Sequence, residues 1–134
     1  MSWVVRNIKW IMLISGVLTC TMLYAAIAPN AALEFMFGET LQGPLAEIVV
    51  RNWGMLIGAV GLMLIYGAFN AHVRKLVVVV ALSSKLAFIG LIFAFGANYL
   101  SKTGASILFD AAVIVLFVMY LVGVEGEGRA AKGG

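Results

Sequence analysis

Charged residues, histidine and cysteine are scarce in this chain of 134 residues, and each shortage excludes a class of protein. Only 11% of the residues are charged, whereas 63% are hydrophobic and the mean hydropathy is +1.08. A water-soluble domain of this size keeps much of its surface in contact with solvent, so it has no interior large enough for so many apolar side chains. We therefore expect lipid to cover most of the surface.

The single cysteine, Cys20, cannot form a disulfide within the chain, and it lies inside an apolar run, where a cysteine usually serves as a small buried apolar residue. The single histidine, His72, lies in a short basic turn, where we interpret it as a solvated residue. One histidine and one cysteine on opposite sides of a membrane cannot together build a zinc or haem site. We predict no metal site.

Four apolar runs are long enough to cross a bilayer, which takes about 20 mainly apolar residues at a rise of about 1.5 Å per residue. They cover residues 8–28, 46–70, 75–97 and 105–122. Residues 26–28 also fit the small-residue pattern of a signal-peptide cleavage site, but we expect the first run to be retained as a span. The predicted fold is all-α: a bundle of four transmembrane helices over residues 1–124, running up, down, up and down.

The basic residues are distributed unequally between the ends of the predicted spans. Six of the nine Lys and Arg residues lie near the N-terminus, the second loop and the C-terminus: Arg6, Lys9, Arg74, Lys75, Arg129 and Lys132. The first loop carries Glu34 and Glu39, and the third carries Lys102. The positive-inside rule then places both termini of this multi-pass protein in the cytoplasm. This topology accounts for the net charge of +3 without a nucleic-acid partner.

The segments outside the spans are short. Pro29 ends the first helix and pushes the residue before it out of helical geometry. Residues 31–43 fit either a short helix on the outer membrane surface or an irregular loop capped by Gly38 and Gly43. Residues 70–75 connect the second and third helices so closely that these must be antiparallel neighbours. Residues 125–134 are Gly, Ala and charged residues without periodicity, so we predict a disordered cytoplasmic tail.

Small residues recur on one face of two of the predicted helices. Gly54, Gly58 and Gly61 follow an i, i+4, i+7 spacing in the second helix. A similar stripe in the third helix consists of Ser83, Ala87, Gly90 and Ala94. Such stripes let neighbouring backbones approach closely in lipid. We expect the two stripes to face each other or the first helix, with homodimerisation through Gly54 and Gly58 as the alternative.

Three charged residues, Arg51, Lys85 and Asp110, lie within the predicted spans. Each costs about 2.5–3.5 kcal/mol at the membrane centre, and such residues usually face the bundle interior and pair with one another. Arg51 and Asp110 fall about six residues from the outer ends of their helices. Lys85 lies about 8 Å deeper and can reach upward with its long side chain. We predict a site in the outer half of the bundle, whose further polar groups are Asn52, Ser84 and Ser106.

Two interpretations of these charges are open. As structural groups, Arg51 fits an interfacial anchor beside Trp53 that pairs with Glu47 one turn earlier, and Lys85 with Asp110 fits a buried ion pair that fixes helix register. As a functional site, two cations and one carboxylate form a pocket for a polar or anionic head, such as a quinone carbonyl or a lipid phosphate. The sequence favours neither interpretation outright.

These same residues carry a resemblance. Arg51-Asn52-Trp53-Gly54 opens the second span, Ser84-Lys85 lies in the third and Asp110 in the fourth. With these motifs the chain resembles a group of bacterial four-helix inner-membrane proteins and, more loosely, the DoxX-like proteins. The resemblance covers most of the chain, but its motifs are short. DoxX-like proteins are linked to quinone or thiol redox systems as membrane subunits, so the resemblance implies an accessory role and a bound quinone. The lack of a cysteine pair or a histidine cluster argues against electron transfer by the side chains of this chain.

Three functions are compatible with the sequence. The first is a non-catalytic accessory subunit or binder of a lipid or quinone head, whose partners are membrane lipid, another membrane protein or a second copy of the chain. The second is a small oligomeric transporter or channel in which Asp110 couples to protons. The third is a lipid-modifying enzyme, which ranks last because a carboxylate beside Lys85 is a poor base. We therefore expect neither catalytic residues nor a resident cofactor.

Overall fold

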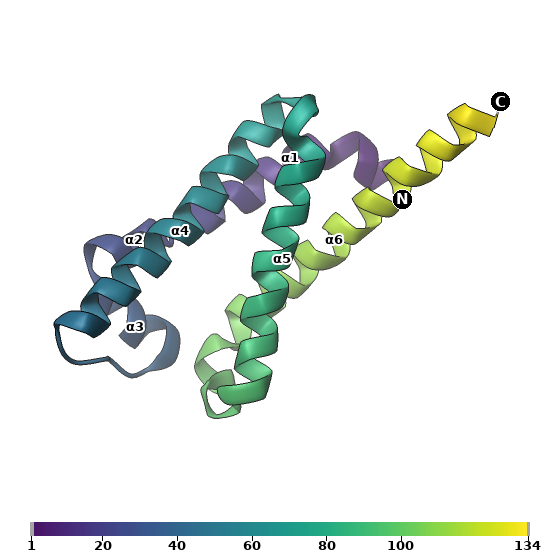
Figure 1. Ribbon diagram of the computed structural model, residues 1–134. Coiled ribbons are helices and arrows are strands. Elements are labelled where there is room, and N and C mark those ends of the chain that lie inside the picture. Colours follow the sequence, from purple (N-terminus) through teal and green to yellow (C-terminus); the bar gives the residue numbers. More distant parts are fainter. Residues whose placement is uncertain (1, 134) are drawn as a thin grey trace.

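The computed structural model describes residues 2–133, which form α-helices and contain no β-strand (Figure 1). The elements are α1 (Ser2–Cys20), α2 (Leu23–Ile27), α3 (Pro29–Phe37), α4 (Pro44–Phe69), α5 (Ala71–Phe95), the 3-10 turn η1 (Ala97–Tyr99) and α6 (Leu100–Gly133). Within the described residues, four helical stretches are long and apolar enough to cross a membrane: Trp3–Ile27, Pro44–Phe69, Ala71–Phe95 and Ala97–Ala130. The chain is therefore an all-α, multi-pass membrane protein, as predicted, although each helix is longer than the apolar run that revealed it.

Consecutive long helices run antiparallel. Asn70 alone separates α4 from α5, and the Arg74 guanidinium donates to the carbonyl oxygens of Gly67 and Ala68 at 3.1 and 2.9 Å, which satisfies the end of α4. Both termini lie toward the α4–α5 turn, and α3 lies with η1 at the opposite end (Figure 1). We call these the termini end and the α3 end. The up, down, up, down order is confirmed, whereas the side of the membrane that each end faces stays a prediction.

The main apolar core fills the termini end, where all four long helices meet. Its buried members are Val4, Ile8, Met12, Leu64, Ala68, Val77, Val78, Ala81, Val113, Phe117 and Tyr120. Toward the α3 end, α4 and α5 diverge from their shared turn (Figure 1). A second, smaller core of Ala25, Ala32, Leu33 and Val50 joins α2, α3 and α4 at that end. The bundle is thus tightly packed at one end and wedge-shaped at the other.

The first span is broken, where we expected one continuous helix. Between α1 and α2 the backbone bonds are of the i to i−3 type, such as Met22 N–H to Thr19 O at 3.1 Å. The Thr21 hydroxyl donates to the Leu18 carbonyl at 2.6 Å, and the Thr19 hydroxyl to the Ser15 carbonyl at 2.7 Å. Threonines that bond back to carbonyls in this way bend helices. The break places a turn of backbone beside the divergent half of the bundle.

Both interpretations of residues 31–43 hold in part. Ala28 leaves helical geometry before Pro29, as predicted, with φ −131° and ψ 74°, and Pro29 then begins α3. Gly38 ends α3 with φ 77°, a left-handed conformation that glycine adopts without strain. Residues 38–43 are not helical and finish at Gly43, whose φ is 100°. A short helix is therefore followed by a short irregular loop.

The glycine stripe of α4 packs against the first span and not against α5. A methyl group at Gly61 would lie 2.7 Å from the Cys20 backbone nitrogen, and one at Gly54 would lie 2.7 Å from the Ala25 side chain. A methyl group at Gly58 would collide with Leu23. This face is occupied within one chain, so it offers no surface for a homodimer through Gly54 and Gly58. The stripe of α5 is exposed instead, and a methyl group at Gly90 would meet no other atom within 4 Å.

Residues 125–133, for which we predicted a disordered tail, continue α6 as a helix beyond the bundle, and residues 125–130, 132 and 133 are exposed (Figure 1). Gly134 lies outside the described residues. Extending an existing helix needs no new nucleation, and Ala, Glu, Arg and Lys are good helix formers. Glu125 and Arg129 also have the i, i+4 spacing that supports a helix. Compositional bias toward Gly and charge had pointed to disorder.

Candidate functional site

Lys85 on α5 and Asp110 on α6 form an ion pair inside the bundle. Lys85 Nζ lies 2.7 Å from Asp110 Oδ1, and the two side chains are only 8% and 15% exposed. Each residue is one turn from a core residue, Ala81 in α5 and Val113 in α6. The pair therefore lies directly on the main core, where the bundle begins to widen. The predicted approach of Lys85 to Asp110 is confirmed.

Lys85 and Asp110 lie at the same depth in the bundle, whereas we expected Lys85 to lie about 8 Å deeper. Lys85 is 12 residues before Ala97, and Asp110 is 12 residues after Asn98, so the α5–α6 turn brings them level. The expected offset was wrong because the fourth helix begins at Leu100, five residues before the apolar run that we used to locate it. The polar residues Ser101, Lys102 and Thr103 had concealed this first turn.

A cavity of about 360 Å³ lies in the divergent half of the bundle, and both members of the pair line it. Its walls come from α1, the break after α1, α3, α4, α5 and α6, so all four spans contribute. Most of the lining is apolar, with the rings of Trp53, Phe88 and Phe109 among its members. The Lys85 ammonium also lies 5.2 Å from the centre of the Phe109 ring. The site is a partly open, mainly apolar cavity with one charged pair in its wall.

Four hydroxyl groups supplement the charged pair in the cavity lining. Ser84 precedes Lys85 in α5, and Ser106 lies one turn before Asp110 in α6, so both flank the ion pair. Thr19 and Thr21 come from the break in the first span. The two threonine hydroxyls donate to backbone carbonyls, which leaves their oxygen lone pairs available as acceptors. The predicted participation of Ser84 and Ser106 is thus consistent with the geometry, and the threonines are additions to it.

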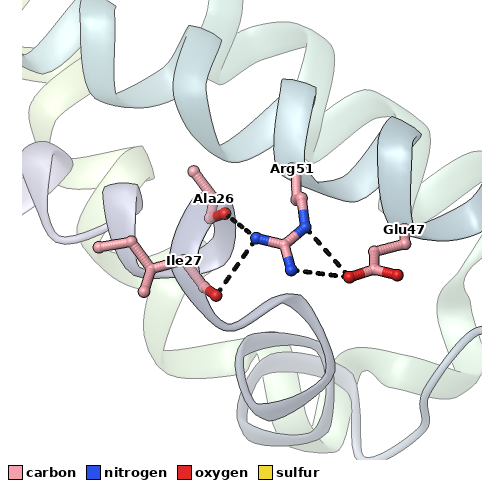
Figure 2. Close-up of polar contacts among 4 residues, drawn as sticks. All are labelled: Ala26, Ile27, Glu47 and Arg51. Carbon is pink, nitrogen blue, oxygen red and sulfur yellow. Dashed lines mark hydrogen bonds and ion pairs between the residues drawn. The ribbon is translucent and has the colours of Figure 1, made fainter.

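Arg51 does not join this site, which corrects the predicted cluster of three charges. Its guanidinium binds Glu47 Oε1 through Nη2 at 2.7 Å and Nε at 3.2 Å, and its Nη1 donates to the carbonyl oxygens of Ala26 at 2.6 Å and Ile27 at 3.3 Å (Figure 2). These carbonyls end α2 and have no further helical partner, so they attract a cation. The interpretation in which Arg51 pairs with Glu47 is confirmed. Arg51 joins α4 to the α2–α3 corner.

Asn52 and Trp53, which follow Arg51 in the chain, face different surroundings. Asn52, a predicted member of the site, is exposed and is not part of the cavity lining. Trp53, which we expected to accompany Arg51 at the membrane surface, is half-buried and lines the cavity. The reason is helical geometry: adjacent residues point about 100° apart, so three consecutive side chains cannot serve one site.

Residues of the α3 end contribute contacts that the sequence did not reveal. The Phe37 ring lies 6.3 Å from the Trp53 ring and 5.6 Å from the Tyr99 ring, edge to face in the second case. The Tyr99 hydroxyl donates to Glu39 Oε2 at 2.8 Å. The sequence did not reveal these contacts because the aromatic and acidic residues that make them are scattered over different segments of the chain. Together they join α3 to the turn between α5 and α6.

Among residues 2–133, no three His, Cys, Asp or Glu side chains gather as they would around a metal ion. Comparisons with models of protein families, with curated proteins and with solved structures give no match. The resemblance to DoxX-like proteins therefore still depends on its short motifs alone. Function is inferred here from the cavity and its ion pair.

Proposed function

We propose that the protein is a non-catalytic membrane subunit that binds the polar head of an amphipathic membrane molecule in the cavity beside Lys85 and Asp110. The observation that carries the proposal is the buried ion pair in the wall of a mainly apolar cavity of about 360 Å³. This volume falls within the range of about 300–1,000 Å³ that is typical of small-molecule sites. An apolar chamber with a few convergent polar groups is the usual form of such sites.

The charges of the site favour an uncharged head. The Lys85 ammonium is neutralised by Asp110, so the pair attracts a phosphate far less than two free cations would. An ammonium has three N–H donors, and the bond to Asp110 Oδ1 occupies one of them. A carbonyl oxygen can accept another, while the rings of Trp53, Phe88 and Phe109 offer flat apolar surface to a ring. This combination supports a quinone head over a phospholipid head.

The same pair argues against catalysis by Asp110. The Asp110 Oδ1 atom already accepts a hydrogen bond from the Lys85 ammonium at 2.7 Å, so this oxygen is occupied and not free to take a proton from a substrate. We propose an accessory role in the cell inner membrane, with the α3 end facing outward and the basic termini end facing the cytoplasm. The distribution of Lys and Arg supports this orientation.

The proposal is tested by analysing the molecules that copurify with the protein. Wild type is compared with Lys85→Met, Asp110→Asn and the double variant Lys85→Met/Asp110→Leu, which leaves no unpaired charge in the bundle. Lys75→Met serves as the control, because its side chain is exposed at the other end of the protein. Lipid extraction and mass spectrometry should find a quinone with wild type and the control, and little with the three site variants.

Equal amounts of bound molecule in all variants would disprove the proposal. A copurifying phospholipid that is lost with Lys85→Met but retained elsewhere would keep the site and overturn the preference for an uncharged head. Size-exclusion profiles of each variant establish that the bundle is folded, and the double variant remains informative where a single substitution unfolds it.

A proton-coupled transporter is the second candidate, and one observation favours it. The break between α1 and α2 lies at the cavity, and broken helices that line cavities are typical of transporter binding sites. Asp110 is the ionisable group that would take up the proton. Vesicles containing the purified protein, loaded with a pH-sensitive dye and supplied with candidate substrates, should show proton movement that Asp110→Asn abolishes. Vesicles without such movement eliminate this candidate.

A further inference from the structure

We propose that α3 and residues 38–43 form a lid on the cavity, fixed at the Arg51 side and opening at the contact between Glu39 and Tyr99. The proposal rests on the proposed function for the identity of what passes the lid. The opening itself is a property of the chain and can be measured without any ligand. Four features of the α3 end support it.

The lid covers the wide end of the cavity. Met36 of α3 lines the cavity, and Phe37 contacts Trp53, whose ring is also part of the lining. In Figure 1, α3 lies at the end of the molecule where α4 and α5 are far apart. A molecule entering from the α3 end would therefore have to displace this segment.

One edge of the lid is firmly attached. Ala32 and Leu33 of α3 are buried against Ala25 and Val50 in the smaller core. Beside them, the Arg51 guanidinium holds the carbonyl oxygens that precede α3 (Figure 2). Apolar burial and a cation with two carbonyl partners both fix the α2–α3 corner to α4. This edge has the properties of a fixed base.

The other edge is attached by contacts near the surface. The Tyr99 hydroxyl donates to Glu39, and both groups are accessible to solvent. Phe37 contacts the Tyr99 ring edge to face, and the side chain of Lys102 lies over Gly38, where an added methyl group would be 3.3 Å from its Cε. Solvent competes for exposed hydrogen bonds, so this edge is the easier one to release.

The ends of the loop supply the backbone freedom that such a motion needs. Gly38 and Gly43 have φ of 77° and 100°, in a region that favours glycine. A methyl group at Gly43 would meet no other atom within 4 Å, so packing does not explain its presence there. Conformation is the remaining reason for glycine at that position. Hinges in mobile segments are typically a few such positions.

The opening is measured by labelling a cysteine in the cavity. Ser106→Cys is introduced into a Cys20→Ser background, and its reaction with a charged, water-soluble methanethiosulfonate is followed in detergent. Tyr99→Phe keeps the ring beside Phe37 but removes the hydrogen bond to Glu39. We expect it to raise the labelling rate about 3- to 10-fold, the factor that one hydrogen bond contributes to an equilibrium. Tyr66→Phe is the matched control, because Tyr66 is an exposed tyrosine of α4 far from the lid, and it should leave the rate unchanged.

A second arm closes the lid chemically. Glu39→Cys and Tyr99→Cys, again with Cys20→Ser, are joined by a short bis-methanethiosulfonate linker that a reductant removes. Linking should slow amide hydrogen exchange in residues 31–37 and stop the exchange of a bound quinone with added quinone. Reduction should restore both. The amides of α5 provide an internal reference.

The outcomes separate the lid from the proposed function. Labelling of Ser106→Cys at one rate in wild type, Tyr99→Phe and Tyr66→Phe overturns the lid, and so does a complete absence of labelling. Faster labelling with Tyr99→Phe, in a protein that holds no membrane molecule, confirms the lid while the proposed function fails. Quinone exchange that is unaffected by the linker overturns the lid while the proposed function stands.

Discussion

Lys85 and Asp110 are 25 residues apart in the chain, yet Lys85 Nζ and Asp110 Oδ1 lie 2.7 Å apart inside the bundle. Because the α5–α6 hairpin turns midway between them, the two positions are at one level, and each charge is neutralised by the other. A lone charge at this depth costs several times the thermal energy, so the pairing is what allows two ionic groups in a membrane-spanning core. It also gives the cavity a polar wall without a net charge.

Removing one member of this pair should destabilise the protein more than removing both. Lys85→Met and Asp110→Leu each leave a buried charged group without its partner, which lowers the free energy of unfolding by about 3 kcal/mol. Lys85→Met/Asp110→Leu leaves none and should lie closer to wild type. Denaturant titrations of the four proteins in one detergent form a double-mutant cycle that measures the coupling. Additive effects of the single substitutions would mean that the pair contributes no coupling.

The close approach of α4 to the first span should make Gly61 intolerant of even a methyl group. Gly61→Ala would place that group 2.7 Å from a backbone nitrogen, so the helices must move apart, and we expect a loss of about 1–3 kcal/mol in the free energy of unfolding. Gly90→Ala is the control, because a methyl group there meets nothing within 4 Å and alanine favours helix. Its unfolding temperature should equal or exceed that of wild type. Equal effects at both glycines would contradict the assigned helix packing.

Arg51 should matter for the α2–α3 corner and not for the binding of a membrane molecule. Arg51→Lys keeps the charge but loses the planar group that contacts Glu47 and two carbonyls together. Because the side chain is 44% exposed, we expect only on the order of 1 kcal/mol of destabilisation. Hydrogen exchange should accelerate in residues 23–37, while the copurifying molecule stays at its wild-type level. Loss of that molecule would show that Arg51 does contribute to the binding site.

The helical extension of α6 should contribute nothing to the stability of the bundle. The side chains of residues 125–130 are exposed, so a chain that stops after Val124 loses no buried contact from them. We expect its unfolding free energy to remain within about 0.5 kcal/mol of the full chain. Circular dichroism should show a decrease in helix content, since these residues are helical in the structure. An unchanged helical signal would return the segment to the disordered state that its composition suggests.

The orientation in the membrane can be read from two exposed positions at opposite ends. In a Cys20→Ser background, Asn98→Cys at the α3 end should react with an impermeant thiol reagent on intact cells. His72→Cys, at the α4–α5 turn, should react only after the cells are permeabilised, because the basic residues gather at that end. The reverse pattern would invert the topology without changing the fold.

The sequence predicted those parts of the site that depend on local helix geometry or on the energetic cost of an unpaired charge in lipid. Lys85 and Asp110 were identifiable because an ionic group in a lipid-embedded helix needs a partner, and few partners were available. Arg51 was assigned to the same site because it met the same criterion at a similar depth. Its true partners are Glu47 and the carbonyls of Ala26 and Ile27, and a backbone carbonyl at the end of a broken helix has no sequence signature.

The amino-acid sequence by itself determined that this is a four-span, all-α membrane protein, because the length and polarity of its apolar runs must match the bilayer. The structure alone decided which faces meet: the α4 glycines against the first span, Trp53 toward the cavity, and Phe37 and Glu39 against Tyr99. In lipid, apolar side chains gain little by choosing one helix neighbour over another. The choice then depends on close packing and hydrogen bonds between distant segments, which periodicity along one chain does not encode.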